Sequence, residues 1–153
     1  YTPLVREIVG DDLDERLMWI NALIEAQAAV QSSPNDPFDL FNLGTDLVAL
    51  GYYDQAAIAY DRARIIGLPW RMMWYQFGPF QAYYETYRYD EVLALADATL
   101  ASGGNIEEIH YWRGRALAAL DQPDQARQAW ERALQMNPHY EDARLALTQW
   151  GVP

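Results

Sequence analysis

The stretch FDLFNLGTDLVALGYYDQAAIAYDRARIIGLP, residues 38–69, decides which fold to expect. Apolar residues recur at helical intervals over 38–50, and Gly51 then breaks the pattern. A second helix is expected over 55–66, with Asp54 as its N-cap. The stretch therefore predicts two helices joined by a short turn.

The same layout recurs along the chain at a nearly constant interval. Residues 106–120 and 125–136 form another predicted helix pair, with Asp124 as the N-cap of the second helix. Residues 13–33 resemble the second helix of an opening unit, and residues 141–149 a terminal capping helix. Three sets of positions are spaced by 34 or 36 residues: Gly10, Gly44, Gly78 and Gly114; Ala22, Ala56, Val92 and Ala126; and Ala29, Ala63, Thr99 and Ala133.

These intervals divide the 153 residues into successive units of one all-α domain. A degenerate opening unit (1–34) is followed by repeat 1 (35–69), an irregular repeat 2 (70–104) and repeat 3 (105–138). A capping helix and tail (139–153) end the chain. Because the first residue is Tyr rather than Met, we expect the chain to be a piece of a longer protein.

Small residues are expected where the two helices of a unit approach closely. Ala56 and Ala126 are predicted to face the glycine of the partner helix. Tyr60 and Trp130, four residues later, are then expected to fill the remaining space.

The spacing of equivalent positions through repeat 2 is 36 residues rather than 34, and the two extra residues are expected between Pro69 and Asp90. Two residues inside a helix would rotate its faces by about 200°. We therefore expect a break, either at Gly78-Pro79 or at the Tyr87-Arg88 turn. Several of the nine aromatic residues of this repeat are expected to remain partly exposed: Trp70, Trp74, Tyr75, Phe77, Phe80, Tyr83, Tyr84, Tyr87 and Tyr89.

Composition argues against several classes of function. The net charge is −11, every basic residue is Arg, and there is no Cys. Repulsion from phosphate makes nucleic acid and anionic membrane surfaces poor partners. No apolar run approaches the roughly 18–20 residues needed to insert across a bilayer.

The residue pattern resembles the tetratricopeptide repeat family. The resemblance implies a right-handed α-solenoid of helix–turn–helix repeats, here with a degenerate first unit and a C-terminal capping helix. Residues at the family's positions are Leu43, Gly44, Gly51, Tyr53, Ala56, Tyr60 and Ala63 in repeat 1, and Gly114, Ala126, Trp130, Ala133 and Pro138 in repeat 3.

A narrower resemblance covers most of the chain. Residues 68–79, 89–97 and 111–114 are similar to the repeat segment that follows a papain-fold, bacteriocin-processing-peptidase-like domain in some bacterial proteins. Tyr1-Thr2-Pro3 and Gly10-Asp11-Asp12 resemble the junction after that domain. With no Cys in the chain, no peptidase role is carried over.

The family resemblance implies that the first helices of the repeats line a concave groove. Asn and Arg there would hold a peptide backbone or carboxylate, and aromatic residues would form pockets. The alternative is that Phe38, Phe41 and Trp112 pack between units. The groove positions are Phe38, Phe41, Asn42 and Thr45 in repeat 1, Met72, Tyr75 and Gln76 in repeat 2, and Glu108, Tyr111, Trp112 and Arg115 in repeat 3.

Metal binding and catalysis are not expected. Glu107 and His110 have the i, i+3 spacing of di-iron bundles, but only one such pair exists. No cofactor motif or catalytic constellation accompanies it. Four carboxylate pairs lie near expected helix starts, where they complement the helix dipole: Asp11-Asp12, Asp90-Glu91, Glu107-Glu108 and Glu141-Asp142.

Two functional hypotheses remain. The chain is either a non-catalytic module that binds a peptide or protein, or a structural module. In the second case its aromatic middle repeat packs against an upstream domain or against another copy of the chain.

Replacing Ala56 or Ala126 with Trp should lower the free energy of unfolding by roughly 1–3 kcal/mol or more, because a close helix contact leaves no room for the larger ring. Thermal and urea unfolding measure this. An unchanged melting temperature would mean that neither alanine belongs to a tight helix pair.

Overall fold

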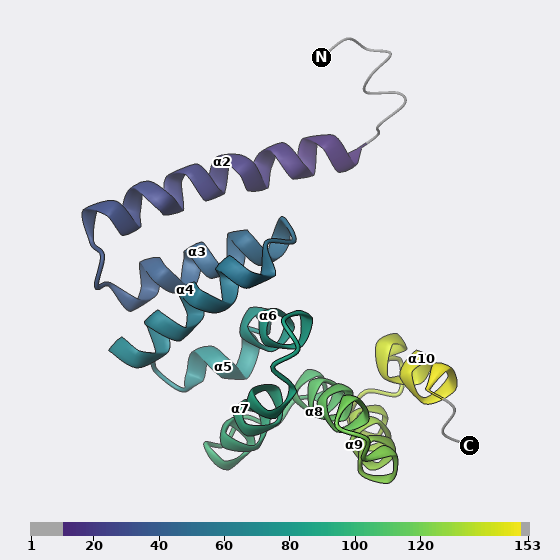
Figure 1. The fold of residues 1–153 in the computed structure, drawn as a ribbon. Coiled ribbons are helices and arrows are strands. Elements are labelled where there is room, and N and C mark those ends of the chain that lie inside the picture. Colours follow the sequence, from purple (N-terminus) through teal and green to yellow (C-terminus); the bar gives the residue numbers. More distant parts are fainter. Residues whose placement is uncertain (1–10, 151–153) are drawn as a thin grey trace. The chain divides into compact units, whose positions relative to one another are not determined.

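The computed structural model describes residues 11–150, which form helices joined by short connections (Figure 1). No strand occurs within this range, so the predicted all-α helical-repeat fold class is confirmed. The chain divides into two compact units, one up to Leu68 and one from Pro69 onward. Gly10 and the proposed junction at Tyr1-Thr2-Pro3 lie outside the described residues.

The described part of the N-terminal unit, residues 11–68, contains three helices. Helix α3 packs on both α2 and α4. Asp36 begins α3 as its N-cap, because its carboxylate accepts the backbone N–H of Phe38 at 2.8 Å and of Asp39 at 3.3 Å. The helices are α2 (Asp11–Ser32), α3 (Pro37–Ala49) and α4 (Tyr53–Ile66).

Residues 69–150 of the C-terminal unit form a short helix and five longer ones. Helix α6 packs on α7, α7 on α8 and α8 on α9. The last helix, α10, lies against both α8 and α9 (Figure 1). The helices are α5 (Arg71–Tyr75), α6 (Gly78–Glu85), α7 (Tyr89–Ala101), α8 (Glu107–Ala119), α9 (Pro123–Met136) and α10 (Glu141–Gln149).

In each of the three helix pairs α3–α4, α6–α7 and α8–α9, the two helices are joined by a turn of the same type. A left-handed residue follows the first helix: Gly51 with φ 82°, Tyr87 with φ 63° or Asp121 with φ 60°. The next residue then donates its backbone N–H to a carbonyl five positions back, which closes the helix end. These bonds run from Tyr52 to Leu47 at 2.9 Å, from Arg88 to Tyr83 at 2.8 Å and from Gln122 to Leu117 at 2.9 Å.

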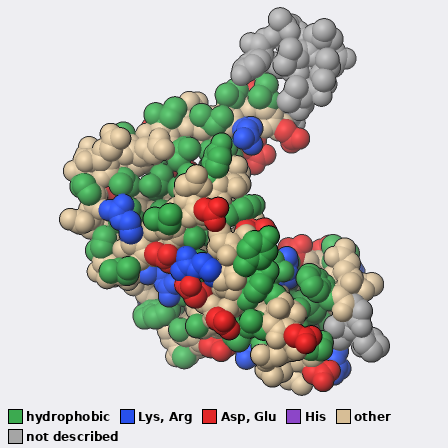
Figure 2. Space-filling model, viewed as in Figure 1, with side chains coloured by type: hydrophobic (Ala, Val, Ile, Leu, Met, Phe, Trp, Pro, Cys, Tyr) green, Lys and Arg blue, Asp and Glu red, His purple; other side chains and the backbone are tan. Residues whose placement is uncertain are grey.

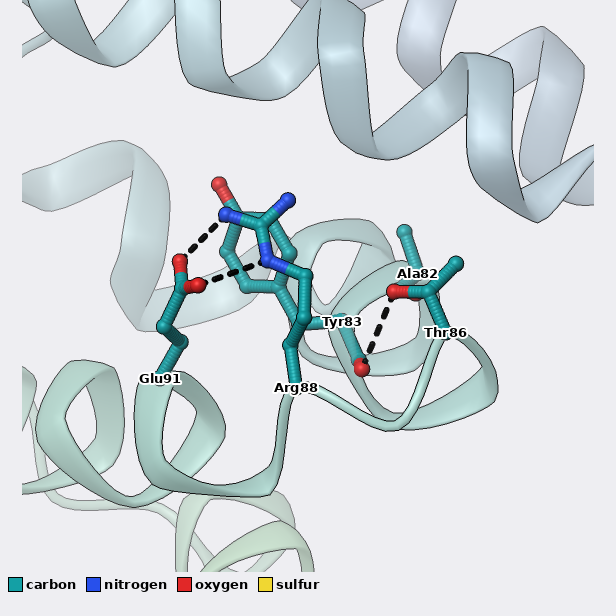
Figure 3. Close-up of polar contacts among 5 residues, drawn as sticks. All are labelled: Ala82, Tyr83, Thr86, Arg88 and Glu91. Carbon is teal, nitrogen blue, oxygen red and sulfur yellow. Dashed lines mark hydrogen bonds and ion pairs between the residues drawn. The ribbon is translucent and has the colours of Figure 1, made fainter.

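Local contacts support the unfavourable backbone of Tyr87. The Arg88 guanidinium lies over the Tyr83 ring at 4.3 Å and donates to both carboxylate oxygens of Glu91 (Figure 3). Thr86 donates its hydroxyl to the carbonyl of Ala82 at 2.8 Å. The turn is therefore fixed by the residues around it, without the glycine that usually adopts this conformation.

The predicted N-caps Asp54 and Asp124 are wrong. Helix α4 begins at Tyr53 and α9 at Pro123, so both aspartates lie within the first turn. The shared turn already orients the chain before each helix, and the aspartates complement the helix dipole from inside it. Pro123 occupies the first helical position, where its missing N–H costs nothing.

Counting from the left-handed residue aligns the three second helices. The fifth, ninth and twelfth residues after it are fully buried in every pair, which confirms the 34- and 36-residue spacing of these helices. The residues are Ala56, Tyr60 and Ala63 in α4, Val92, Ala96 and Thr99 in α7, and Ala126, Trp130 and Ala133 in α9.

The prediction that Tyr60 and Trp130 fill the space beside the partner helix is confirmed at Gly44 and Gly114. A Cβ on Gly44 would lie 2.7 Å from Cε1 of Tyr60, and one on Gly114 would lie 2.3 Å from Nε1 of Trp130. In each of these two pairs, the aromatic ring of the second helix therefore packs directly against the glycine of the first helix. Ala56 and Ala126, four residues before these rings on the same helices, are also fully buried.

The alignment of Gly78 with these glycines is wrong. Gly44 and Gly114 stand seven residues before their turn residues, and the corresponding position before Tyr87 is Phe80. The extra residues lie at Gln76 and Phe77, where the chain leaves α5 in an extended conformation before Gly78 begins α6. The expected break thus falls just before Gly78-Pro79.

In repeat 2 the large and the small residue exchange places relative to repeats 1 and 3. Its first helix carries the large Phe80 where the other pairs have glycine, and its second helix carries Ala96 where they have Tyr60 or Trp130. Phe80 and Ala96 are both fully buried. Each helix pair thus combines one large and one small buried residue at these equivalent positions, whichever helix supplies the large one.

The reversal predicts a rescue in repeat 3. Trp130→Ala should cost about 3–5 kcal/mol of unfolding free energy by leaving a cavity, and Gly114→Phe should destabilise by overpacking. The double variant should recover at least about 1 kcal/mol relative to the sum of the single changes, because it reproduces the arrangement in α6–α7. A double-mutant cycle by urea unfolding measures the coupling. Strict additivity would contradict size complementarity.

Candidate peptide-binding surfaces

Two of the four predicted groove residues on α3 are accessible. Phe38 and Asn42 are exposed, whereas Phe41 is buried with its ring edge on Tyr60, centroid to centroid 4.9 Å. Thr45 is half-buried, and its hydroxyl lies 3.2 Å from the Tyr60 hydroxyl. Phe41 and Thr45 therefore belong to the packing of α3 on α4, and Phe38 and Asn42 remain available to a ligand.

A cleft of about 360 Å³ lies between α2 and α3 in the N-terminal unit. Burial raises the pKa of Asp46, and the neighbouring carboxylate of Glu25 raises it further. None of the lining residues is basic. The lining consists of three alanines and Glu25 from α2, with Asp39, Asn42, Thr45 and Asp46 from α3.

Arg115 on α8 lies in a cage of three aromatic rings, Tyr84, Tyr111 and Trp112. Its guanidinium is 4.2 Å from the centroid of Tyr84 and 5.6 Å from those of the other two. Its Nη1 donates to the Tyr111 hydroxyl at 2.6 Å. Helix α6 supplies Tyr84 and α8 supplies the rest, so the cage depends on the packing of these two helices.

The charge of Arg115 has no carboxylate partner among the described residues. Burial alone would lower its pKa, but hydrogen bonds to Tyr84 and Tyr111 outweigh that effect and raise it. Its Nε is buried and has no hydrogen-bond partner within residues 11–150. The aromatic rings and the Tyr111 hydroxyl therefore fix the position of the Arg115 guanidinium, and its Nε–H makes no hydrogen bond within residues 11–150.

Four arginines of this unit, Arg88, Arg113, Arg127 and Arg144, pair with acids. Arg113, two residues before Arg115 on the same helix, donates to Asp97 at 2.8 Å. Arg127 lies 3.7 Å from Glu131. On the face drawn in Figure 2, arginine side chains likewise lie among carboxylates. Arg115 and Glu108 form no ion pair within residues 11–150.

A second pocket of about 170 Å³ lies between α8 and α10. Arg115 and Tyr111 form one side, and Asp142, Leu145, Ala146, Gln149 and Trp150 form the other. Sequence reasoning identified the α8 side and missed both Tyr84 and the α10 side. The spacing of 142, 145, 146 and 149 along one helix face was an available signal.

Glu108 and Trp112 complete the predicted set on α8. Both are half-buried. Burial raises the pKa of Glu108, and the carboxylates of Glu107 and Asp142 raise it further. The Trp112 ring lies 5.8 Å from Tyr84 and 5.3 Å from Tyr111, so it takes part in the cage rather than in packing alone.

The repeat 2 residues lie on α5 and in the break after it. Met72 is half-buried, Tyr75 is 67% exposed, and Gln76 is exposed. Trp74 anchors α5, because its Nε1 donates to the Ser102 hydroxyl at 3.0 Å and its ring covers Gly104. Participation of Met72, Tyr75 and Gln76 in a binding surface stays a prediction.

Glu107 and His110 have partners that explain them without a metal. Glu107 accepts from the Asn137 side chain at 3.3 Å, and His110 Nε2 lies 2.9 Å from Oδ1 of Asn105. Within residues 11–150 no group of three or more His, Asp or Glu side chains is placed to hold a metal ion. No helix in the same range has the length and apolar character to cross a membrane.

Comparisons with known proteins support the repeat assignment. Residues 107–140 match the family model of the tetratricopeptide repeat. A solved structure described as "MamA RS-1 ArsTM double mutant" is similar to this chain, with a TM-score of 0.75 and 21% identity over 97% of this chain and 82% of that one. At this identity the likeness shows the fold alone. No curated protein matches the sequence.

Together, the repeat match and the fold support a protein-interaction scaffold at the general level. The narrower resemblance to a segment after a papain-fold domain stays a prediction.

Asp46→Asn should raise the free energy of unfolding at neutral pH by a few tenths of a kcal/mol, a small effect because solvent screens this half-buried group. The pKa of Asp46 is raised in the folded state, so the native protein favours the neutral form that Asn mimics. The gain should therefore disappear as the pH falls below the pKa of the unfolded carboxyl. Urea unfolding against pH tests this, with exposed Asp14→Asn on α2 as the control; an equal gain in the control would contradict it.

Proposed function

We propose that this chain is a non-catalytic module of a larger bacterial protein and binds a peptide or protein partner through the first helices of its repeats. The observation that carries the proposal is Arg115, which is held in its aromatic cage beside an open pocket and has no carboxylate partner within residues 11–150. Tetratricopeptide repeats are typically non-catalytic scaffolds, which agrees with this reading.

The chemistry around Arg115 favours a carboxylate. A guanidinium binds carboxylates through charge-assisted hydrogen bonds, and the ring stack fixes its plane beforehand, so less conformational entropy is lost on binding. Leu145 and Trp150, 43% and 47% exposed, supply apolar surface on the other side of the pocket. A peptide that ends in a carboxylate and carries an apolar side chain near its end fits these groups.

Long-range charge restricts the ligand further. With a net charge of −11, the protein repels strongly acidic peptides. Asp142 lines the same pocket and disfavours a second carboxylate there. Neutral or mildly basic peptides with one terminal carboxylate are therefore the expected ligands. In the N-terminal unit, exposed Asn42 would supply amide hydrogen bonds to a peptide backbone.

The second candidate is a structural module. Three aromatic residues of the middle repeat favour it, because Trp70, Tyr75 and Tyr87 are 49%, 67% and 79% exposed. Such side chains would be covered by an upstream domain or by another copy. Mass that rises with concentration, and falls again in the Trp70→Ala/Tyr75→Ala variant, would favour self-association.

Removing Arg115 should weaken peptide binding without unfolding the protein. A library of peptides with free and with amidated C-termini is screened against wild type, and the ligands found are measured on Arg115→Ala and Asn42→Ala/Arg115→Ala. Free-carboxylate ligands should lose at least about tenfold in affinity, since truncating a desolvated charged contact costs roughly 2 kcal/mol or more.

Arg113→Ala is the matched control, because it removes the same charge from the same helix where Asp97 already pairs it. Melting temperatures confirm folding. Binding that survives the double variant but disappears in Trp70→Ala/Tyr75→Ala would move the interface to the middle repeat and contradict the proposal.

A further inference from the structure

Helix α2 has a row of small residues that the other described helices cover only in part. Ala22, Ala26 and Ala29 precede Ala56, Tyr60 and Ala63 of α4 by 34 residues each. The corresponding rows of α4, α7 and α9 are fully buried. In α2, by contrast, Ala26 is 9% exposed, and Ala22 and Ala29 are only half-buried.

The first helix of this opening unit is not formed within the described residues. The position that would hold the left-handed turn is Leu17, 34 residues before Gly51, and it lies inside the continuous helix α2. Of the described helices, only α3 packs extensively on α2. Within residues 11–150 the row therefore has the next repeat on one flank and no helix of its own unit on the other.

The cleft of about 360 Å³ lies at this uncovered place. It is lined by all three alanines of the row and by α3. In the C-terminal unit the equivalent place is filled, because α6 packs on both α7, its own second helix, and α8, the first helix of the next repeat. The α2–α3 cleft therefore lies where the first helix of a repeat would pack, and no helix within residues 11–150 occupies it. We call this place the seat.

We propose that the α2–α3 cleft receives an amphipathic helix from a partner protein, one that carries a bulky apolar residue on its inner face and Arg or Lys along its edges. The apolar requirement comes from Ala26, which stands where Tyr60 and Trp130 stand in repeats 1 and 3. Ala96 of repeat 2 has the same small size, and there the first helix supplies Phe80.

The basic requirement comes from the cleft's charges. Glu25, Asp39 and Asp46 line it without a basic residue among the lining side chains. A neutral helix would strip water from these carboxylates without compensation, whereas Arg or Lys would pair with them. A second copy of this chain fits poorly, because its 22 acidic and 11 basic residues bring more repulsion than attraction.

This seat goes beyond the proposed function: it shares Asn42 with that proposal, but Arg115, the residue that carries the proposal, takes no part in it. The observation behind that proposal is Arg115 in the C-terminal unit, whereas the seat lies wholly within the N-terminal unit. Recognition there follows helix-in-groove packing rather than the capture of a terminal carboxylate.

The test uses two synthetic helical peptides as long as α3, 13 residues, with amidated C-termini. The basic probe carries Phe on its apolar face and Arg along the edges, and the neutral probe has Gln in place of each Arg. The basic probe should bind wild type at least about tenfold more tightly than the neutral probe, and its affinity should fall as salt rises.

Two variants of the seat should weaken the basic probe. Exposed Glu25→Arg reverses a charge of the cleft and should reduce affinity about tenfold. Ala22→Trp fills the seat without changing its charge and should weaken both probes. Glu85→Arg is the matched control, because it makes the same change of charge on an exposed residue of the other unit and should alter affinity by less than about twofold. Melting temperatures report folding.

Three results would overturn the proposal: no binding of the basic probe, equal affinity for wild type and Glu25→Arg, or equal losses in Glu25→Arg and Glu85→Arg. Self-association of wild type that Glu25→Arg abolishes would assign the seat to a second copy instead. Because the probes lack a terminal carboxylate, Arg115→Ala should leave their binding unchanged. Failure at the seat and failure at Arg115 are thereby distinguished.

Discussion

The close approach of paired helices, with an aromatic ring lying on a glycine, is the contact on which repeats 1 and 3 depend. Tyr60 covers Gly44, and Trp130 covers Gly114. The same rings also hold the neighbouring candidate site, because the Tyr60 hydroxyl lies 3.2 Å from that of Thr45 and Trp130 donates to the Tyr111 carbonyl at 3.2 Å. The same aromatic residues therefore pack the two helices together and position residues of the candidate binding surface.

The periodic features of the fold could be predicted because close packing repeats the same residue sizes. The rows containing Ala56 and Ala126 were identified from spacing alone, and they are fully buried. Gly78 was misaligned because the repeats keep their register from the turn, and in repeat 2 the turn residue is Tyr87 with φ 63°. The sequence indicates a turn at Tyr87-Arg88, but it does not indicate that Tyr87 takes the left-handed conformation, which contacts of Arg88 with Tyr83 and Glu91 support.

The candidate site could be predicted only where one helix supplies it. Arg115 was found from its position in the repeat, but its aromatic cage includes Tyr84 from α6, and the facing pocket wall comes from α10. Contacts between helices distant in sequence have no local signature. The Asp54 and Asp124 caps failed for a related reason, because the turn geometry sets the helix start before side-chain capping can act.

The two ends of the described chain are finished differently. Helix α10 covers the last repeat, and its Ala143 and Ala146 are 0% and 4% exposed in one cluster with Trp130 and Ala133. Repeat arrays need such caps, because each repeat buries its apolar face only against a neighbour. A row adapted to solvent would carry long polar side chains, yet α2 keeps Ala22, Ala26 and Ala29, the small residues of a packed row. That choice of residues is what favours a helix over solvent in the α2–α3 cleft.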